Sequence, residues 1–220
     1  MGGPQAAAQR LVVELLVSNL QQGSGRRAPR SRGAGFRFHF LTAKRWPDLE
    51  RLFGARGACG GCWCMMWRSK RGDFERQKGV ANKRALRRIV ESRRPVGVIA
   101  YHRGQPVGWC AIAPREDYPA LGRSRILRPV DDQPVWSVSC FFIARGYRRR
   151  GLSAELLGAA VDCGRERGAK IVEGYPIEPS KHSAPDVFAW TGIASAFRDA
   201  GFQEVARRSP GRPLMRKTCQ

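Results

Sequence analysis

An apolar stretch that passes through three arginines and a glycine into a second apolar stretch constrains this chain more than any other feature. The segment "VWSVSCFFIA" (135–144) is the strongest strand signal in the sequence. The segment "GLSAELLGAAVDCGRERG" (151–168) carries leucine, alanine and valine at helical spacing, and Gly168 stands where a glycine ends a helix. The sequence therefore predicts a buried strand joined to a helix by a short, very basic turn.

The elements around this unit predict one mixed sheet. Residues 36–40 alternate like a strand, helical spacing follows as far as Phe53, and "NKRALRRIVES" (82–92) carries a second apolar stripe. Two strands joined by a turn at Gly104 come next. After the central helix we expect a strand in "AKIVEGYPI", a short helix near "GIASAFRDAG", and strands in "FQEVARRS" and "RPLMRKTC". This order predicts an α/β sandwich around a mixed, mostly antiparallel sheet of about seven strands, with about four helices.

The first 34 residues differ in composition from the rest. Residues 21–35, "QQGSGRRAPRSRGAG", lack any apolar period, which favours disorder, and the apolar run before them could form a loose amphipathic helix. We therefore expect residues 1–34 to be a disordered or loosely helical extension and residues 35–220 to be one domain. No apolar run approaches the ~20 residues of a membrane span, and no secretory signal is expected, so we predict a cytoplasmic protein.

The charge of the chain has two interpretations. The formal net charge is +22, and the excess is almost all arginine, 33 against 7 lysines. Such a charge favours polyanions such as nucleic acid, through counterion release on phosphates. A genome whose codons favour arginine, alanine and glycine would give the same bias, and the arginines are spread along the whole chain.

The basic turn has the chemistry of an anion site. It has the sequence "RRRGLS" (148–153), and a helix N-terminus offers unpaired N–H groups and a partial positive charge. Gly151 allows close backbone approach, and Ser153 is small. The spacings of the P-loop and of the dinucleotide-binding motif are both absent. We interpret the turn as a pyrophosphate site, with a basic helix start on a solvated surface as the alternative.

Together with the element order, the turn resembles the Arg/Gln-x-x-Gly-x-Gly/Ala motif of the GNAT superfamily of N-acetyltransferases. Arg148, Gly151 and Ser153 carry the match, with serine in place of the usual glycine or alanine, and the resemblance covers about residues 35–218. It implies acetyl-CoA as acetyl donor, the pantetheine arm along the fourth strand and the pyrophosphate on the turn. The cofactor-binding residues it implies are Phe142, Ile143, Ala144, Arg148, Arg149, Arg150, Gly151, Leu152 and Ser153.

Direct acetyl transfer needs a base for the amine and an acid for the departing thiolate. Glu173 is the leading candidate base because a strand carboxylate in an apolar run needs a partner or a task, and a salt bridge to an arginine is the alternative. Glu116 follows the third strand as a second candidate. The tyrosine that many family members use as acid is missing from "FAWTGIASAF", so Ser195 or Tyr175 could replace it, or the thiolate could leave unassisted.

The remaining reactive residues give weaker signals. Cys59, Cys62 and Cys64 offer three ligands where zinc wants four, so we predict no metal and expect "CWCMMW" to build part of an acceptor pocket, with a redox-sensitive pair left open. The three histidines, His39, His102 and His182, are expected to be incidental.

The sequence is compatible with two functions. The first is an acetyl-CoA-dependent N-acetyltransferase acting on a primary amine of a small molecule or peptide, as a monomer or homodimer. The second is a basic nucleic-acid- or ribosome-binding protein that keeps the fold without catalysis. The concentration of arginines in the turn at 148–150 favours the enzyme.

Overall fold

The structure is a computed structural model that describes residues 35–178 and 190–219. The expected extension at 1–34 and His182 lie outside the described residues. Within the described ranges, no helix is both long and apolar enough to cross a membrane.

Seven strands form one sheet in the order β1-β2-β3-β4-β5-β7-β6. Only β4 and β5 run parallel, and every other neighbouring pair is antiparallel. The mixed, mostly antiparallel sheet is therefore confirmed. The strands are β1 (Phe36–Phe40), β2 (Val98–His102), β3 (Gln105–Pro114), β4 (Trp136–Ile143), β5 (Ile171–Gly174), β6 (Gln203–Arg207) and β7 (Pro213–Thr218).

Six α-helices occur among the described residues, against about four expected. Two of the six, α3 and α5, are short helices in connections that carry no apolar period, which is why the sequence pattern missed them. The helices are α2 (Trp46–Phe53), α3 (Arg71–Arg76), α4 (Val80–Glu91), α5 (Pro119–Gly122), α6 (Leu152–Arg165) and α7 (Ala194–Asp199).

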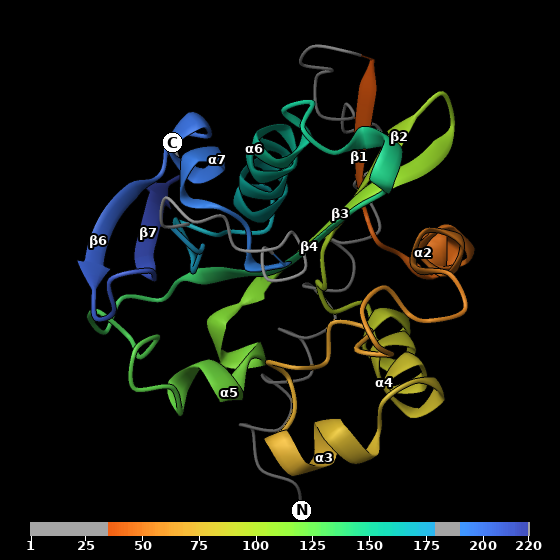
Figure 1. The fold of residues 1–220 in the computed structure, drawn as a ribbon, viewed down its shortest axis with the longest axis horizontal. Helices are drawn as coiled ribbons and strands as arrows, with labels where there is room; N and C mark the ends of the chain where they lie inside the picture. The colour runs from red at the N-terminus through yellow and green to blue at the C-terminus, as the bar shows by residue number, and fades with distance from the viewer. Residues whose placement is uncertain (1–34, 179–189, 220) are drawn as a thin grey trace, which may run out of the picture.

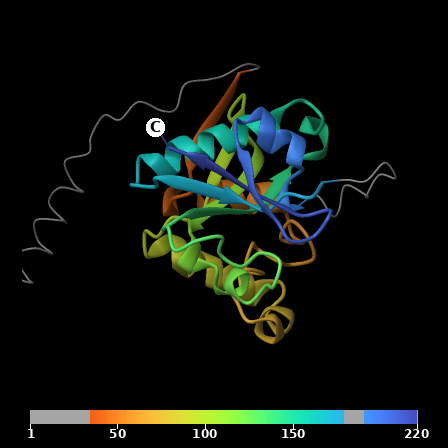
Figure 2. The ribbon, with the colours of Figure 1, turned by 90° about the vertical axis from the view of Figure 1, so that its left-hand side faces the viewer.

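The helices cover both faces of the sheet. Figure 1 shows α6 and α7 on one side of the strands and α2, α4 and α5 on the other, and Figure 2 shows the same three layers from a second direction. Leu152, Leu156 and Leu157 of α6 are buried against one face with Phe197 of α7. The other face carries a second cluster built by α2 and α4 and a third around α5. The predicted α/β sandwich is therefore the observed architecture.

Candidate active site

The strands that flank β4 change along its length. β5 pairs with β4 only at Trp136, Ser137 and Val138, whereas β3 accompanies β4 as far as Ile143. From residue 139 onward, the edge of β4 on the β5 side has no strand partner among the described residues. A ligand that carries amide groups fits such an edge because it can pair with the backbone as a strand does. This gap between β4 and β5 is called the slot below.

A segment close to α7 borders the slot. Ile177 and Ile193 form a parallel bridge beyond the end of β5. A Cβ atom built on Gly192 would lie 3.0 Å from the Phe141 ring of β4, so this backbone approaches the strand closely. Ser195, one of the predicted catalytic residues, is exposed in the first turn of α7 and directly follows this segment.

The basic turn connects the open end of β4 to α6. After η3 (Arg145–Tyr147), Arg149 and Gly151 adopt positive φ angles of 58° and 76°. A Cβ atom built on Gly151 would meet no other group within 4 Å, so this side of the turn is open. The backbone N–H groups of Leu152 and Ser153 donate to no backbone acceptor in the described part of the chain. The turn therefore presents unpaired donors beside an open surface, as an anion site requires.

Side-chain contacts hold the turn against the sheet. Arg148 Nε donates to the carbonyl oxygen of Ile143 at 3.1 Å. The guanidinium of Arg150 lies 5.8 Å above the centre of the Tyr147 ring. The Tyr147 hydroxyl lies 3.2 Å from Nδ1 of His102 on β2. His102, expected to be incidental, thus packs behind the turn rather than in the slot.

Glu173 lies at the closed end of the slot, inside a buried charge cluster. Its side chain is 0% exposed and faces Arg115 and Arg216, which are 14% and 10% exposed. Arg115 donates to Oε1 at 2.8 Å, and Arg216 Nε donates to Oε2 at 2.7 Å. Both carboxylate oxygens therefore already accept hydrogen bonds from cations. The ion pair that the sequence left as the alternative for Glu173 is present.

Tyr175 and Ser137 complete this cluster. The Tyr175 hydroxyl donates to Oε1 of Glu173 at 2.8 Å and also accepts a hydrogen bond from Arg115. Its single proton is thus committed, so the 2.7 Å contact with Ser137 Oγ places the serine as donor. Burial, and then the charge of Glu173, raises the pKa of Tyr175 well above its ordinary value. Tyr175 is therefore held protonated, with its proton directed at Glu173.

The fourth predicted catalytic residue lies apart from this cluster. Glu116 is exposed in η2 (Arg115–Asp117), directly after β3. Because Pro114 pairs with Trp136, this end of β3 lies beside the start of β4. Glu116 is therefore at the opposite end of β4 from Arg148.

The cysteine loop is mostly buried. Trp63, Cys64 and Met65 belong to the core cluster under α2 and α4, and Trp109 Nε1 donates to Cys64 Sγ at 3.2 Å. The neighbouring Cys64 thiol, and then burial, raises the pKa of Cys62 far above its ordinary value, which leaves little thiolate. Among the described residues, no group of three or more His, Cys, Asp and Glu side chains is placed to hold a metal ion.

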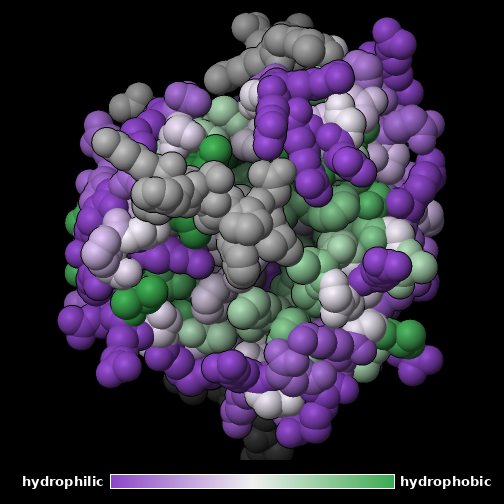
Figure 3. All heavy atoms as spheres, in the orientation of Figure 1, coloured by the Kyte–Doolittle hydropathy of each residue, from purple (hydrophilic) through white to green (hydrophobic). Residues whose placement is uncertain are grey.

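Part of the aromatic loop reaches the surface near the slot. Met66 is 43% exposed, and the rings of Trp67 and Trp190 lie 5.9 Å apart. Trp190 and Phe142 of β4 both pack on the edge of the same core cluster. Figure 3 shows hydrophobic side chains gathered between β3 and α2 within a hydrophilic rim. Of the expected wall of aromatic and methionine side chains, Met66 is exposed and Trp67 half-buried, whereas Trp63 and Met65 lie in the core. An acceptor pocket at this loop stays a prediction.

Sequence reasoning missed both arginines of the buried cluster. Arg216 stands directly opposite Glu173 in the pairing of β5 with β7, and Arg115 follows the last residue of β3. In the sequence, both look like members of a large arginine population. The available signal was an arginine at alternate positions with buried residues in "PLMRKT", which marks one face of a strand.

Comparisons with known proteins point to one family and one fold. The model of a family described as the acetyltransferase (GNAT) family matches residues 63–186, more than half of the chain. No curated protein sequence matches this chain. A GNAT-family acetyltransferase from Streptococcus agalactiae is 13% identical, with a TM-score of 0.51 over 87% of this chain and 99% of that chain.

Two further solved structures share the fold. A GNAT-family acetyltransferase from Listeria monocytogenes is 12% identical, with a TM-score of 0.50 over 87% of this chain and 99% of that chain. A ribosomal-protein-S5-alanine acetyltransferase from Vibrio fischeri is 9% identical, with a TM-score of 0.51 over 89% of this chain and 98% of that chain. At these identities, the similarity concerns the fold.

Proposed function

The chain belongs to the GNAT family of acetyltransferases, and on that premise we propose that it moves an acetyl group from acetyl-CoA directly to a primary amine of a small molecule or peptide. The observation that carries this proposal is the open edge of β4 from residue 139 to Ile143, which leads to the unpaired N–H groups at the start of α6. Acetyl-CoA, when bound, supplies an activated thioester carbonyl.

The residues of the slot fit this cofactor in two respects. The pantetheine arm carries amide groups, and the edge of β4 on the β5 side, which includes Phe142 and Ile143, has no strand partner there. Ala144 follows this edge, and its backbone is already hydrogen-bonded to Val107 and Tyr147. The pyrophosphate needs several donors and positive charge, which the turn from Arg148 to Ser153 offers around an open Gly151. Eight of the nine predicted cofactor-binding residues therefore keep that role in the proposal, and Ala144 is left as a neighbour of the site.

Three of the four predicted catalytic residues receive different roles in the proposal, and Tyr175 shares the positioning role of Glu173. Glu173 is fully buried and accepts hydrogen bonds from two arginines, so we assign it to positioning: it orients Tyr175 and Arg115 at the closed end of the slot. Ser195 is the candidate proton donor for the thiolate because it is exposed next to the segment that borders β4. Glu116 is the candidate base for an amine that arrives from the α5 side.

The compartment and assembly remain proposals. All seven cysteines are free thiols, which supports a reducing compartment such as the cytoplasm. A monomer or a homodimer is expected.

Calorimetric titration with acetyl-CoA tests the cofactor site. We expect saturable binding to the native chain and a loss of at least roughly tenfold in affinity in Gly151→Glu, whose carboxylate would fill the open side of the turn and repel phosphate. Gly158→Glu, at a half-buried position of α6 where an added Cβ would meet nothing within 4 Å, makes the same change of charge away from the turn and should bind normally. Equal affinity in the two variants would refute the assignment of the turn.

Thiol release in the presence of an amine library then tests the reaction. We expect turnover with at least one primary amine, and a Ser195→Ala variant that binds acetyl-CoA normally but turns over more slowly. A chain that binds acetyl-CoA but releases no thiol with any amine or basic peptide would contradict transfer to an amine while leaving the cofactor site intact.

A further inference from the structure

A basic cavity lies on the opposite face of the sheet from α6. It has a volume of about 580 Å³ and is lined by the first two strands, the turn between β2 and β3, η1 (Ala43–Arg45) and α2. Phe36 and Phe38 of β1 are buried against α6, so the alternate residues Arg37 and His39 face the other side. The side chains that line this cavity, called the edge pocket below, are Arg37, His39, Arg45, Asp48, Tyr101 and Arg103.

The three arginines of the edge pocket have no acidic partner. Among the described residues, the guanidinium groups of Arg37, Arg45 and Arg103 form no ion pair with a carboxylate. Most carboxylates of the fold are already paired with other arginines or lysines. Burial, and then the charges of Arg45 and Arg37, lowers the pKa of His39. The pocket therefore has a positive potential that an anionic ligand would neutralise.

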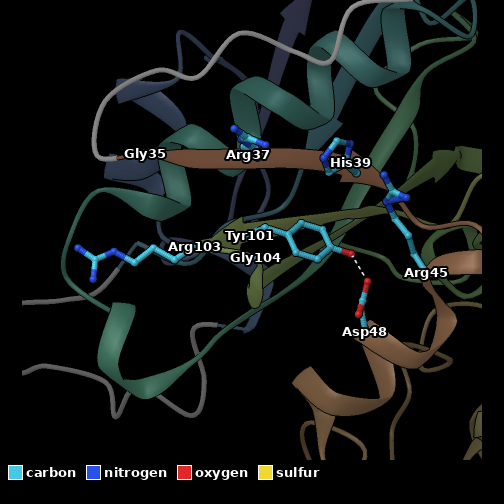
Figure 4. A pocket seen from close by; sticks show the side chains of 8 residues that line it. All are labelled: Gly35, Arg37, His39, Arg45, Asp48, Tyr101, Arg103 and Gly104. Carbon is cyan, nitrogen blue, oxygen red and sulfur yellow. Dashed lines mark hydrogen bonds between the residues drawn. The ribbon is translucent and has the colours of Figure 1, made fainter.

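The floor of the pocket is aromatic. Tyr101 and His39 are both half-buried, and their rings meet edge-to-face with centroids 5.6 Å apart. The Tyr101 hydroxyl donates to Asp48 at 2.7 Å, which fixes the orientation of the ring (Figure 4). Arg37 is the direct cross-strand neighbour of Tyr101. A half-exposed ring beside a guanidinium is the arrangement that binds a nucleobase and its phosphate in single-stranded nucleic acid.

Asp48 narrows the class of ligand. Its carboxylate already accepts hydrogen bonds from Tyr101 and from Arg51, at 2.7 and 3.0 Å, so its charge is partly balanced. It would still repel a bare polyphosphate, whereas the amino group of a base or the 2′-hydroxyl of a ribose can donate to it. The pocket therefore favours a nucleotide over a simple anion.

The arginines are too widely spread for one phosphate. Figure 4 shows Arg103 at one end of the pocket and Arg45 at the other, with Tyr101 and Asp48 between them. His39 pairs with Ile99, and Arg103, directly after β2, lies four residue steps further along the chain, or about 13 Å in an extended strand. A strand of nucleic acid carries phosphates on both sides of each base, and this spacing would match arginines at both ends of the pocket.

We propose that the edge pocket binds a nucleotide within single-stranded RNA, with the base on Tyr101 and the flanking phosphates on Arg37, Arg45 and Arg103. This site is separate from the cofactor turn, because Arg37, His39 and Tyr101 face α2 whereas the turn leads into α6.

Fluorescence anisotropy with a short labelled oligoadenylate RNA, at near-physiological salt, tests the site. We expect Arg37→Ala/Arg103→Ala to bind roughly tenfold more weakly than the native chain. The matched control is Arg71→Ala/Arg125→Ala, which removes two exposed arginines outside the pocket. An equal loss in both double variants would mean that the RNA follows overall charge alone, and it would overturn the proposal.

Two substitutions of Tyr101 test the stacking floor. Tyr101→Phe keeps the ring and should bind the RNA within about twofold of the native chain, whereas Tyr101→Leu keeps apolar bulk without a π-face and should bind roughly tenfold more weakly. Thermal unfolding checks that both variants fold. If the leucine variant binds as well as the phenylalanine variant, the base does not stack on Tyr101 and the proposal fails.

Competition separates this site from its alternatives. Saturating acetyl-CoA should leave RNA binding unchanged, and displacement by acetyl-CoA would assign the RNA to the cofactor site instead. AMP should compete at least roughly tenfold less well than unlabelled oligoadenylate, because it carries phosphate on one side of the base only. Equal competition would identify the occupant as a free nucleotide and overturn the proposal of single-stranded RNA.

Discussion

Arginines serve opposite purposes at the two ends of the slot. At the closed end, Arg115 and Arg216 are mostly buried and hold both oxygens of Glu173, with Tyr175 and Ser137 around them. At the open end, Arg149 and Arg150 of the turn are exposed, and neither forms an ion pair with an acid among the described residues. The same residue type is neutralised in one place and left available in the other.

The difference follows from the cost of removing charge from water. A buried guanidinium is tolerated only when a carboxylate and further hydrogen bonds compensate it. An exposed guanidinium remains hydrated, so it needs no partner in the protein and can exchange water for a phosphate. We therefore expect changes at the closed end to alter stability and changes at the open end to alter ligand affinity.

The largest effect on stability is expected from Glu173→Gln. This change leaves Arg115 and Arg216 without their buried counter-charge, so the free energy of unfolding should fall by about 3–5 kcal/mol in urea denaturation. Glu204→Gln, which removes an exposed carboxylate paired with Arg207, is the matched control and should cost less than about 1 kcal/mol. If Glu173→Gln keeps native stability but loses the acidic limb of the pH–rate profile, Glu173 acts as the base.

A smaller loss is expected from Tyr175→Phe. The change removes the hydroxyl that donates to Glu173 and accepts from Ser137, so it should lower the free energy of unfolding by about 1–3 kcal/mol. Differential scanning calorimetry measures this loss. Because Tyr175 is 1% exposed, acetyl-CoA affinity should not change, and a large drop in affinity would place the hydroxyl in the cofactor site.

Gly151→Ala should have a small effect on stability and a large effect on affinity. An alanine in the left-handed backbone conformation of Gly151 costs about 1 kcal/mol of stability. Its methyl group narrows the open side of the turn and should weaken acetyl-CoA binding roughly tenfold. Gly158→Ala within α6 is the control: it should stabilise the chain by about 0.5–1 kcal/mol and leave affinity unchanged. A turn variant that loses stability but retains affinity would break the contrast between the two ends.

The smallest effect concerns acid stability at the rim of the buried cluster. Arg216, which also holds Glu173, donates to Asp131 and lowers the pKa of that carboxyl from its ordinary value of 3.8. Because the folded pKa is the lower one, this pair contributes its full stability above about pH 3.8 and loses it as the pH falls through the lowered pKa.

The difference between the urea midpoints measured at neutral pH and near pH 3 should therefore be slightly smaller in Asp131→Asn than in the native chain. The neighbouring Asp132→Asn serves as the control, since Asp132 forms no ion pair in the described part of the chain. Identical pH dependence in the two variants would show that the ion pair between Arg216 and Asp131 contributes nothing to stability.

The sequence by itself determined the architecture and the position of the turn. Strand and helix periods, with Gly104 and Gly168 as stops, predicted the seven strands and the larger helices, because burial of one face imposes those periods on local sequence. The chemistry of "RRRGLS" likewise marked the start of α6, because a helix N-terminus is a local feature.

Only the tertiary structure decided which charges meet. Glu173 had two interpretations in the sequence, and its pairing with Arg115 and Arg216 depends on the register of β5 with β7 and on the end of β3. The slot exists because β5 stops pairing at Val138, and the edge pocket exists because β1 turns Arg37 toward Tyr101. These contacts join residues far apart in the chain, and a pattern within one segment cannot encode the distance between two segments.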